Sequence, residues 1–523
     1  MRRIMIVLAA LCAAALPLRG DDVVARIREE EQAHSQILRT MHALSDLYGP
    51  RLTGSPNQKA AAEWALRQMR DWGMQNAHLE PWDFGHAGWT NERASGAIVA
   101  PVRQELALEA VAWTPSTRGT ITAQAVVIDV PDTPTKEELA RALAAVHVRG
   151  RIAMIGNGAP APIDLDPILH RLDDKLLTDI LQPNRPPQPE TPPDGKLTNS
   201  EKNRQIDAYL RAAGALLRVN DARRAHGLIR AAANDTFEPR NALPSVILRN
   251  EDYGRIARIA ADGTPVTLQF DVRNRLWPEG RASYNTIAEI PGGDRRDEVV
   301  ILGAHLDSWH VATGATDDAI GCAIMMEAAR ILRALAIQPR RTIRVALWTG
   351  EEQGLYGSQD YVARHYGTAE DPLPDFSKLA AYINLDSGTG RIRAANVFGP
   401  PEAAAILRDA LAPLHDLGFA GTVAHKIRKL RSTDATTFSR AGLPAIGLTQ
   451  DPIEYGASWH TSVDTYERID EGEAKDAAIV VATLAYELAT RDEPLPRFPR
   501  GEMPPAQGPP PAARQRGGGA RVR

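Results

Sequence analysis

Acidic and histidine side chains gather at the ends of two short apolar runs in the middle of the chain. The run VVILGA leads directly into His305 and Asp307, and the run TIRVALW leads into the adjacent pair Glu351 and Glu352. Both runs are rich in β-branched residues and are bounded by turn signals, which is typical of buried strands. Imidazoles and carboxylates bind metal ions or transfer protons. The sequence therefore indicates a metal or acid–base site at these strand ends.

Further candidate ligands follow other predicted elements. A helical stretch, 319–336, is entered through Asp317 and Asp318, the strand AAYINLDSG ends at Asp386, and His460 lies in the loop after LPAIGLTQ. In open α/β sheets, ligands bind outside the carboxyl ends of the strands, where these side chains are expected. The candidate metal ligands are His305, Asp317, Glu352, Asp386 and His460.

This ligand set suits zinc. Histidine and carboxylate ligands bind Zn²⁺, and a shared carboxylate holds two such ions about 3.5–4 Å apart. Taken alone, Asp317 could simply cap a helix and the Glu351–Glu352 pair could face solvent. Two carboxylates at the end of a buried strand are costly unless a metal or protons engage them, which favours the metal site. We expect Asp307 to accept a hydrogen bond from the ring of His305.

The surrounding pattern predicts an α/β domain in two pieces. Strands and helices alternate over residues 21–110 and 273–492, which favours one discontinuous α/β catalytic domain. Residues 111–272 between them are rich in short β-type runs and indicate a separate inserted domain. Within it, residues 164–199 contain the run PNRPPQPETPPDG, which predicts an exposed loop.

Both ends of the chain differ from the rest. Residues 1–20 begin with the basic MRR and continue with a short apolar run, which is typical of a signal peptide cleaved near Gly20. The protein is therefore expected to be exported, to the periplasm or the extracellular space, without an integral membrane span after cleavage. Residues 493–523 consist largely of Pro, Gly and Arg, and we expect a disordered tail.

Charge and cysteine content argue against a nucleic-acid partner and against an intrachain disulfide. The 523 residues contain 61 Lys plus Arg and 65 Asp plus Glu, so the net charge of −4 gives no electrostatic reason to expect nucleic acid as a partner. One of the two cysteines, Cys12, lies in the predicted signal peptide. Cys322 is then alone in the mature chain, where no intrachain disulfide can form, and its apolar helix predicts a small buried side chain.

Several motifs resemble those of one enzyme family. The runs AHLDSW, GATDDAIG, WTGEEQGLYGS, NLDSG and SWHTSVDT resemble the co-catalytic zinc exopeptidases of clan MH, which include bacterial leucyl aminopeptidases. The runs YGPRLTGS, HLEPW and SYNTIAEIPG look most like the plasma glutamate carboxypeptidase (carboxypeptidase Q) branch. The resemblance covers most of residues 25–490. It implies a mixed, mostly parallel sheet sandwiched by helices, and it makes the β-rich insertion a protease-associated domain.

The resemblance also implies a role for each matching residue. It implies two Zn²⁺ ions per chain, one held by His305 and Asp386, the other by Glu352 and His460, with Asp317 bridging them. The bond between Asp317 and Asp318 is then expected to be a cis peptide.

Catalysis would depend on two further side chains. Glu351 would act as the general base that takes a proton from water and passes it to the leaving amine. Tyr455, in the loop before His460, would add a hydrogen bond to the tetrahedral intermediate.

We therefore expect an exported dizinc exopeptidase that hydrolyses dipeptides or removes N-terminal residues from short peptides. Two alternatives share the fold: a one-zinc acyltransferase similar to glutaminyl cyclases, and a catalytically silent, receptor-like binding protein. The complete ligand set and the intact base argue against both. The sequence leaves open the side-chain preference, whether a free amine or a free carboxylate is recognised, and the oligomeric state, with a homodimer as one alternative.

Overall fold

The computed structural model describes residues 20–161, 163, 168–183, 195–430 and 433–506. The predicted signal peptide lies outside the described residues apart from its last position, Gly20. Within the part of the chain that is described, no helix is both long and apolar enough to cross a membrane.

The site-bearing half of the molecule is built on a mixed sheet of eight strands in the order β1-β10-β12-β11-β13-β16-β14-β15. The central strands β12, β11, β13 and β16 are mutually parallel. The pairs β1–β10, β10–β12 and β14–β16 are antiparallel, and β14 and β15 pair in parallel. The strands are β1 (Gln75–Asp83), β10 (Ala282–Ile290), β11 (Arg295–His305), β12 (Arg341–Trp348), β13 (Leu379–Leu385), β14 (Ile392–Phe398), β15 (Gly421–His425) and β16 (Ala445–Gln450).

The apolar run of β11 is continuous because helices cover both faces of the sheet. Val300 and Leu302 belong to a core shared with helices α1, α3, α8 and α13, whereas Val299 and Ile301 face a core shared with α9 and α11. Successive side chains of a strand point to opposite faces, so a strand between two helical layers must be apolar throughout. This mixed α/β architecture confirms the predicted fold class.

Several helices begin at residues whose side chains cap a helix. Ser55, for example, caps the start of α3 through its hydroxyl, which accepts from the N–H of Gln58. The helices are α1 (Gly20–His34), α2 (Ile37–Met41), α3 (Pro56–Asp71), α4 (Lys136–Ala144), α5 (Asp174–Ile180), α6 (Asn199–Ala213), α7 (Asn250–Ala261), α8 (Ile320–Ala334), α9 (Tyr356–His365), α10 (Pro401–Leu411), α11 (Asp434–Ala441), α12 (Tyr455–Ser458) and α13 (Glu471–Thr490), with π-helical turns η1 (His42–Leu47) and η4 (Ala315–Ala319).

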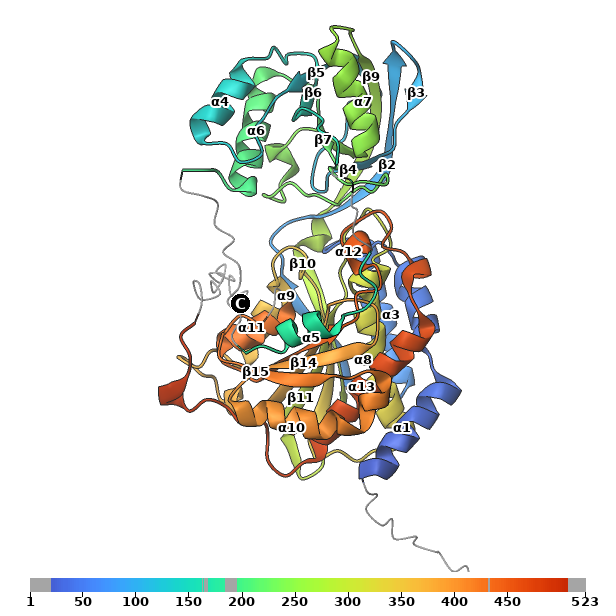
Figure 1. The fold of residues 1–523 in the computed structure, drawn as a ribbon, viewed down its shortest axis with the longest axis vertical. Coiled ribbons are helices and arrows are strands. Elements are labelled where there is room, and N and C mark those ends of the chain that lie inside the picture. Colours follow the sequence, from blue (N-terminus) through green and yellow to red (C-terminus); the bar gives the residue numbers. More distant parts are fainter. Residues whose placement is uncertain (1–19, 162, 164–167, 184–194, 431–432, 507–523) are drawn as a thin grey trace, which may run out of the picture.

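A second sheet of eight strands forms the upper lobe in Figure 1, with the order β3-β2-β9-β5-β6-β7-β8-β4. Its strands are β2 (Gly88–Ala100), β3 (Gln104–Glu105), β4 (Leu108–Ala110), β5 (Ile121–Ile128), β6 (Ile152–Ile155), β7 (Leu217–Asp221), β8 (Ser245–Leu248) and β9 (Thr267–Trp277). The chain enters this lobe through β2 and leaves it through β9, and these two strands pair with each other. The division of the chain at residues 111–272 stays a prediction.

Part of the predicted Pro-rich loop, residues 164–199, packs on the site-bearing lobe. Helix α5 lies beside β14 in Figure 1. Just before it, Arg171 forms ion pairs with Asp451 and Glu473, and the N–H of Leu172 donates to Asp451 at 2.8 Å. Composition predicts an exposed loop here. It does not reveal the docking, because the ionic contacts that hold this segment involve residues 280 and 302 positions away.

The first part of the predicted C-terminal tail also packs on the site-bearing lobe. Leu495 is 2% exposed, and the guanidinium of Arg497 donates to the carbonyl of Phe376 at 2.8 Å. Phe498 contacts Phe398 with ring centroids 5.4 Å apart. Residues 507–523 lie outside the described residues.

Candidate metal centre and active site

The five predicted metal ligands meet at one edge of the first sheet. β11 ends at His305, β13 is followed directly by Asp386, and Glu352 stands four residues after β12. His460 belongs to the loop after β16. Because β12, β11, β13 and β16 are parallel neighbours, their carboxyl ends converge, and the ligands separated in sequence come together.

The first ligand group contains His305, Asp317 and Asp386. The Nε2 atom of His305 lies 3.1 Å from Oδ1 of Asp317 and 3.9 Å from Oδ2 of Asp386. The side chain of His305 is 1% exposed and that of Asp386 is 11% exposed. This group therefore lies at the bottom of the site.

The second group contains Asp317, Glu352 and His460. The Nε2 atom of His460 lies 3.1 Å from Oδ2 of Asp317 and 2.9 Å from Oε2 of Glu352. Asp317 thus presents one carboxylate oxygen to each group. In each group, the ligand atoms all lie within 4.8 Å of one another.

These residues fit a pair of zinc ions. Zinc–ligand bonds of about 2.0–2.2 Å place neighbouring ligand atoms of a tetrahedral site roughly 3.3–3.6 Å apart. The distances in the two groups, 2.9–3.9 Å, bracket that spacing. In the described part of the chain, the buried Oε1 atom of Glu352 has no hydrogen-bond partner. An unpartnered buried carboxylate oxygen is costly, and a cation would remove that cost.

The electrostatics of the site favour positive charge. Burial raises the pKa of Glu351 well above its usual value, and burial together with Asp317 raises the pKa of Glu352 to about 7. Burial lowers the pKa of His460, but Glu352 and Asp317 outweigh it and raise the value to about 10. The carboxylates therefore repel one another and attract any cation placed among them.

The carboxylate of Asp318 stabilises the turn that carries Asp317. The Asp317–Asp318 peptide bond is cis, as the family resemblance implies. The carboxylate of Asp318 accepts from the N–H of His305 at 3.3 Å and from the N–H of Gly321 at 3.1 Å. Cys322 is free and buried as predicted, and its thiol donates to the carbonyl of His305. Asp318 and Cys322 therefore fix the backbone of His305.

Asp307 makes a different contact from the one expected. The Nδ1 atom of His305 lies 2.9 Å from the backbone carbonyl oxygen of Asp307 and 3.7 Å from its carboxylate. The carboxylate accepts instead from the N–H groups of Glu351 and Glu352, at 3.3 and 3.4 Å, and from the Thr53 hydroxyl at 2.9 Å. Asp307 therefore ties the end of β11 to the loop after β12.

A cavity of about 680 Å³ opens onto these ligands, within the usual size range for small-molecule sites. Glu351 and Tyr455 line it, and the Tyr455 hydroxyl lies 3.5 Å from Oδ1 of Asp386. Sequence analysis assigns no role to several other lining residues, because neither their types nor their spacing indicates metal binding or proton transfer: Gln353, Gln359, Lys429, Thr436, Arg440 and Trp459.

The second-sheet lobe touches the rim of this cavity. The guanidinium of Arg230 stacks 4.3 Å from the ring centroid of Trp459. The N–H of Ala231 donates to the carbonyl of His460 at 2.8 Å, and the N–H of Ser462 donates to the carbonyl of Ile229 at 3.0 Å. The second-sheet lobe therefore supports the loop that carries His460. The contacting segments are more than 200 residues apart, so no local sequence signal could reveal this contact.

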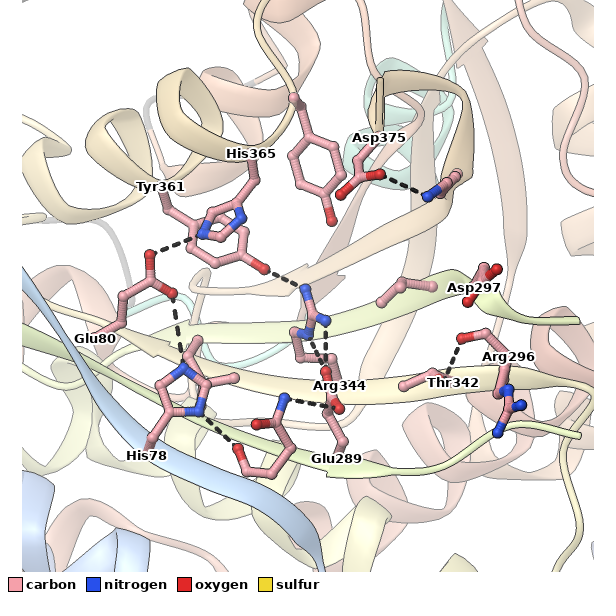
Figure 2. Close-up of a pocket in the computed structure, with 15 residues that line it drawn as sticks. His78, Glu80, Glu289, Arg296, Asp297, Thr342, Arg344, Tyr361, His365 and Asp375 are labelled. Atoms are coloured by element: carbon pink, nitrogen blue, oxygen red, sulfur yellow. Dashed lines mark hydrogen bonds and ion pairs between the residues drawn. The ribbon is translucent and has the colours of Figure 1, made fainter. Parts of the chain in front are cut away.

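A second cavity, of about 310 Å³, lies between α9 and the strands β1, β10 and β12 (Figure 2). Several of its charged groups pair with one another. Glu80 lies 2.8 Å from Nε2 of His365, and Arg344 donates to Glu289 at 2.7 Å and to the Tyr361 hydroxyl at 2.6 Å. The paired groups engage one another, whereas both candidate metal-ligand groups lie at the strand ends, so we place the chemistry there.

Comparisons with known proteins indicate one peptidase family. Residues 285–485 match Peptidase family M28. Carboxypeptidase Q of Mus musculus is 27% identical and covers 87% of this chain and 86% of its own length, and that of Homo sapiens is 27% identical and covers 89% and 88%. A crystal structure of a Peptidase M28 precursor from Shewanella amazonensis is 25% identical, has a TM-score of 0.66 and covers 92% of this chain and 99% of its own.

The family match covers residues 285–485, which include all five candidate metal ligands. With these relatives, the match supports the prediction that the protein is a zinc-dependent exopeptidase. An aminopeptidase from Aneurinibacillus sp. strain AM-1, with 20% identity and a TM-score of 0.56, shares the fold over 91% of this chain and 98% of its own.

Proposed function

We propose that this zinc-dependent exopeptidase uses two zinc ions to hydrolyse dipeptides or to remove N-terminal residues from short peptides. The observation that carries the proposal is the position of Asp317, whose two carboxylate oxygens face two separate histidine–carboxylate groups. A carboxylate shared in this way is the hallmark of a co-catalytic metal pair. His305 and Asp386 would complete one site, and Glu352 and His460 the other.

Zinc, when bound, would polarise the scissile carbonyl and make water more acidic. Glu351 is the only carboxylate of the Glu351–Glu352 pair that stands outside both ligand groups. Its carboxylate would take the proton from the attacking water and then deliver it to the leaving amine. Burial raises the pKa of Glu351, with further contributions from Asp386 and Asp434, so this carboxyl can hold the proton between the two steps.

The Tyr455 hydroxyl is placed to assist this reaction. It lines the same cavity as Glu351 and reaches Asp386. Burial raises the pKa of Tyr455 well above its usual value, so the phenol keeps its proton. It would donate a hydrogen bond to the oxyanion of the tetrahedral intermediate.

The substrate class follows from the size and charge of the cavity. A volume of about 680 Å³ accommodates a short peptide. The cationic side chains of Lys429 and Arg440 line the same cavity as the candidate ligands, so the free carboxylate of an unblocked peptide has groups of opposite charge nearby. The names of the relatives, carboxypeptidase Q and aminopeptidase, agree with either end being recognised.

A substrate panel tests the proposal. Purified protein is assayed with free dipeptides, with dipeptides blocked at either end, and with aminoacyl amides. We expect cleavage of free dipeptides that is lost after chelation and restored by Zn²⁺. Zinc-loaded protein that cleaves none of them would indicate a silent binding protein, and cyclisation of N-terminal glutamine would indicate an acyltransferase.

Export is part of the proposal. Residues 1–20 carry the basic and apolar pattern of a cleaved signal peptide. The N-terminus of protein recovered from the periplasm or medium of an expressing bacterium is expected to begin near Asp21. Protein that keeps Met1 and stays in the cytosol would contradict this.

A further inference from the structure

Arg51 lies in the run YGPRLTGS, between η1 and α3, and is fully buried. Its guanidinium donates four hydrogen bonds to backbone carbonyl oxygens. Nε donates to Leu306 at 2.6 Å, and Nη2 donates to Gly314 at 2.8 Å. Nη1 donates to Leu44 and Thr313, each at 2.8 Å. A fixed planar fork with five N–H donors is suited to holding several acceptors at once.

Three of these four acceptors belong to the loop that joins two metal-ligand positions. Leu306 directly follows His305, and Gly314 stands three residues before Asp317. The guanidinium of Arg51 therefore holds both ends of loop 306–314. The distance between His305 and Asp317 is set by the shape of this loop, because one residue precedes it and the other follows it closely.

The backbone of Arg51 adds a second connection to the same loop. Its N–H donates to the hydroxyl of Ser308 at 3.0 Å, and its carbonyl accepts from the N–H of Ser308 at 3.2 Å. Gly314 has a φ of +67°, and a Cβ atom there would lie 2.3 Å from the Cβ of Ser308 and 3.0 Å from Nη2 of Arg51. The loop is therefore packed tightly around this arginine.

A buried cation bound to neutral carbonyls is costly in free energy unless other charges compensate for it. Burial lowers the pKa of Arg51, and among the groups that oppose this shift are Asp464, Asp307 and Asp318. Asp307 and Asp318 each contact the backbone of a proposed ligand or the base. Arg51 thus also places a positive charge behind the carboxylates of the site.

We infer that Arg51 is a positioning residue of the metal centre, which sets the spacing of His305 and Asp317 by holding the loop between them. This inference rests on the proposed dizinc function. A purely structural role would stabilise the fold without any selective effect on zinc affinity.

Arg341 provides a matched control. It is also fully buried, and it donates to the backbone carbonyls of Arg491 and Asp492 at 2.6 and 3.0 Å and to Glu298. It stands at the start of β12, whereas the site lies beyond the other end of that strand. Arg341→Lys therefore removes a similar set of hydrogen bonds away from the metal centre.

The experiment compares zinc affinity in Arg51→Lys and Arg341→Lys by competition with a chromophoric chelator, together with the Tm of each metal-free protein. We expect both variants to have a lower Tm, and only Arg51→Lys to bind zinc about tenfold or more weakly, the scale seen when groups behind metal ligands are removed. Unchanged affinity in Arg51→Lys, or equal weakening in both variants, would overturn the inference.

Ser308→Ala keeps the test decisive if Arg51→Lys does not fold. It removes one hydroxyl that accepts from Arg51 and leaves every ligand in place. We expect a smaller weakening of zinc binding in the same direction, and unchanged affinity would again contradict the inference. Wild-type protein that binds no zinc would instead refute the proposed function itself, so the two failures are distinguishable.

Discussion

Glu351→Gln is expected to keep its full zinc content and to lose turnover by at least about 10²-fold, the lower end of what a general base contributes. The amide has nearly the size and shape of the carboxylate, but it cannot accept the proton of the attacking water. Glu351 lies outside both ligand groups, so the metals keep all their ligands. The measurement is zinc stoichiometry and kcat on the same preparation.

Glu352→Gln is the matched control for this prediction. It makes the same chemical change at the next residue, but it removes an anionic ligand that lies 2.9 Å from His460. One zinc should bind more weakly, and part of the lost activity should return with excess zinc. If Glu351→Gln lost metal while Glu352→Gln kept it, the two roles would be reversed. If both kept metal and turnover, the site would lie elsewhere.

Asp317→Asn should cause the largest loss of zinc of any single ligand substitution, because this residue belongs to both groups. Loss of its negative charge weakens both sites at once, and we expect zinc content to fall from two per chain toward zero, with loss of activity. Asp386→Asn, which touches one group only, should still retain about one zinc per chain.

Asp434→Asn controls for the loss of any buried carboxylate near the site. Asp434 is 2% exposed and lies in neither group, and burial raises its pKa to about 7. This variant should keep both metals. Equal zinc content in Asp317→Asn and Asp434→Asn would contradict the bridging role of Asp317.

The convergence of the candidate ligands could be predicted from the sequence because each stands beside a strongly patterned element. His305 and Asp386 directly end or follow strands whose apolar runs are unmistakable, and the parallel order of β11 and β13 brings them together. The same regularity made the fold class predictable, since strands buried on both faces must lie between layers of helices.

Sequence patterns do not predict contacts between segments that are distant along the chain. The bond from Arg51 to Leu306 joins residues 255 positions apart, and Arg171 pairs with Asp451 across 280 positions. Asp307 was expected to face His305 through its carboxylate, but a backbone carbonyl also satisfies an imidazole N–H, and composition does not distinguish the two. Such choices depend on the packed geometry of the loops.

The zinc content of the purified wild-type protein tests the central claim most directly. Metal analysis after dialysis against zinc-free buffer, on protein shown to be active with a free dipeptide, should give about two zinc ions per chain. Full activity with one zinc ion or none per chain would contradict the shared role of Asp317 and, with it, the dizinc mechanism.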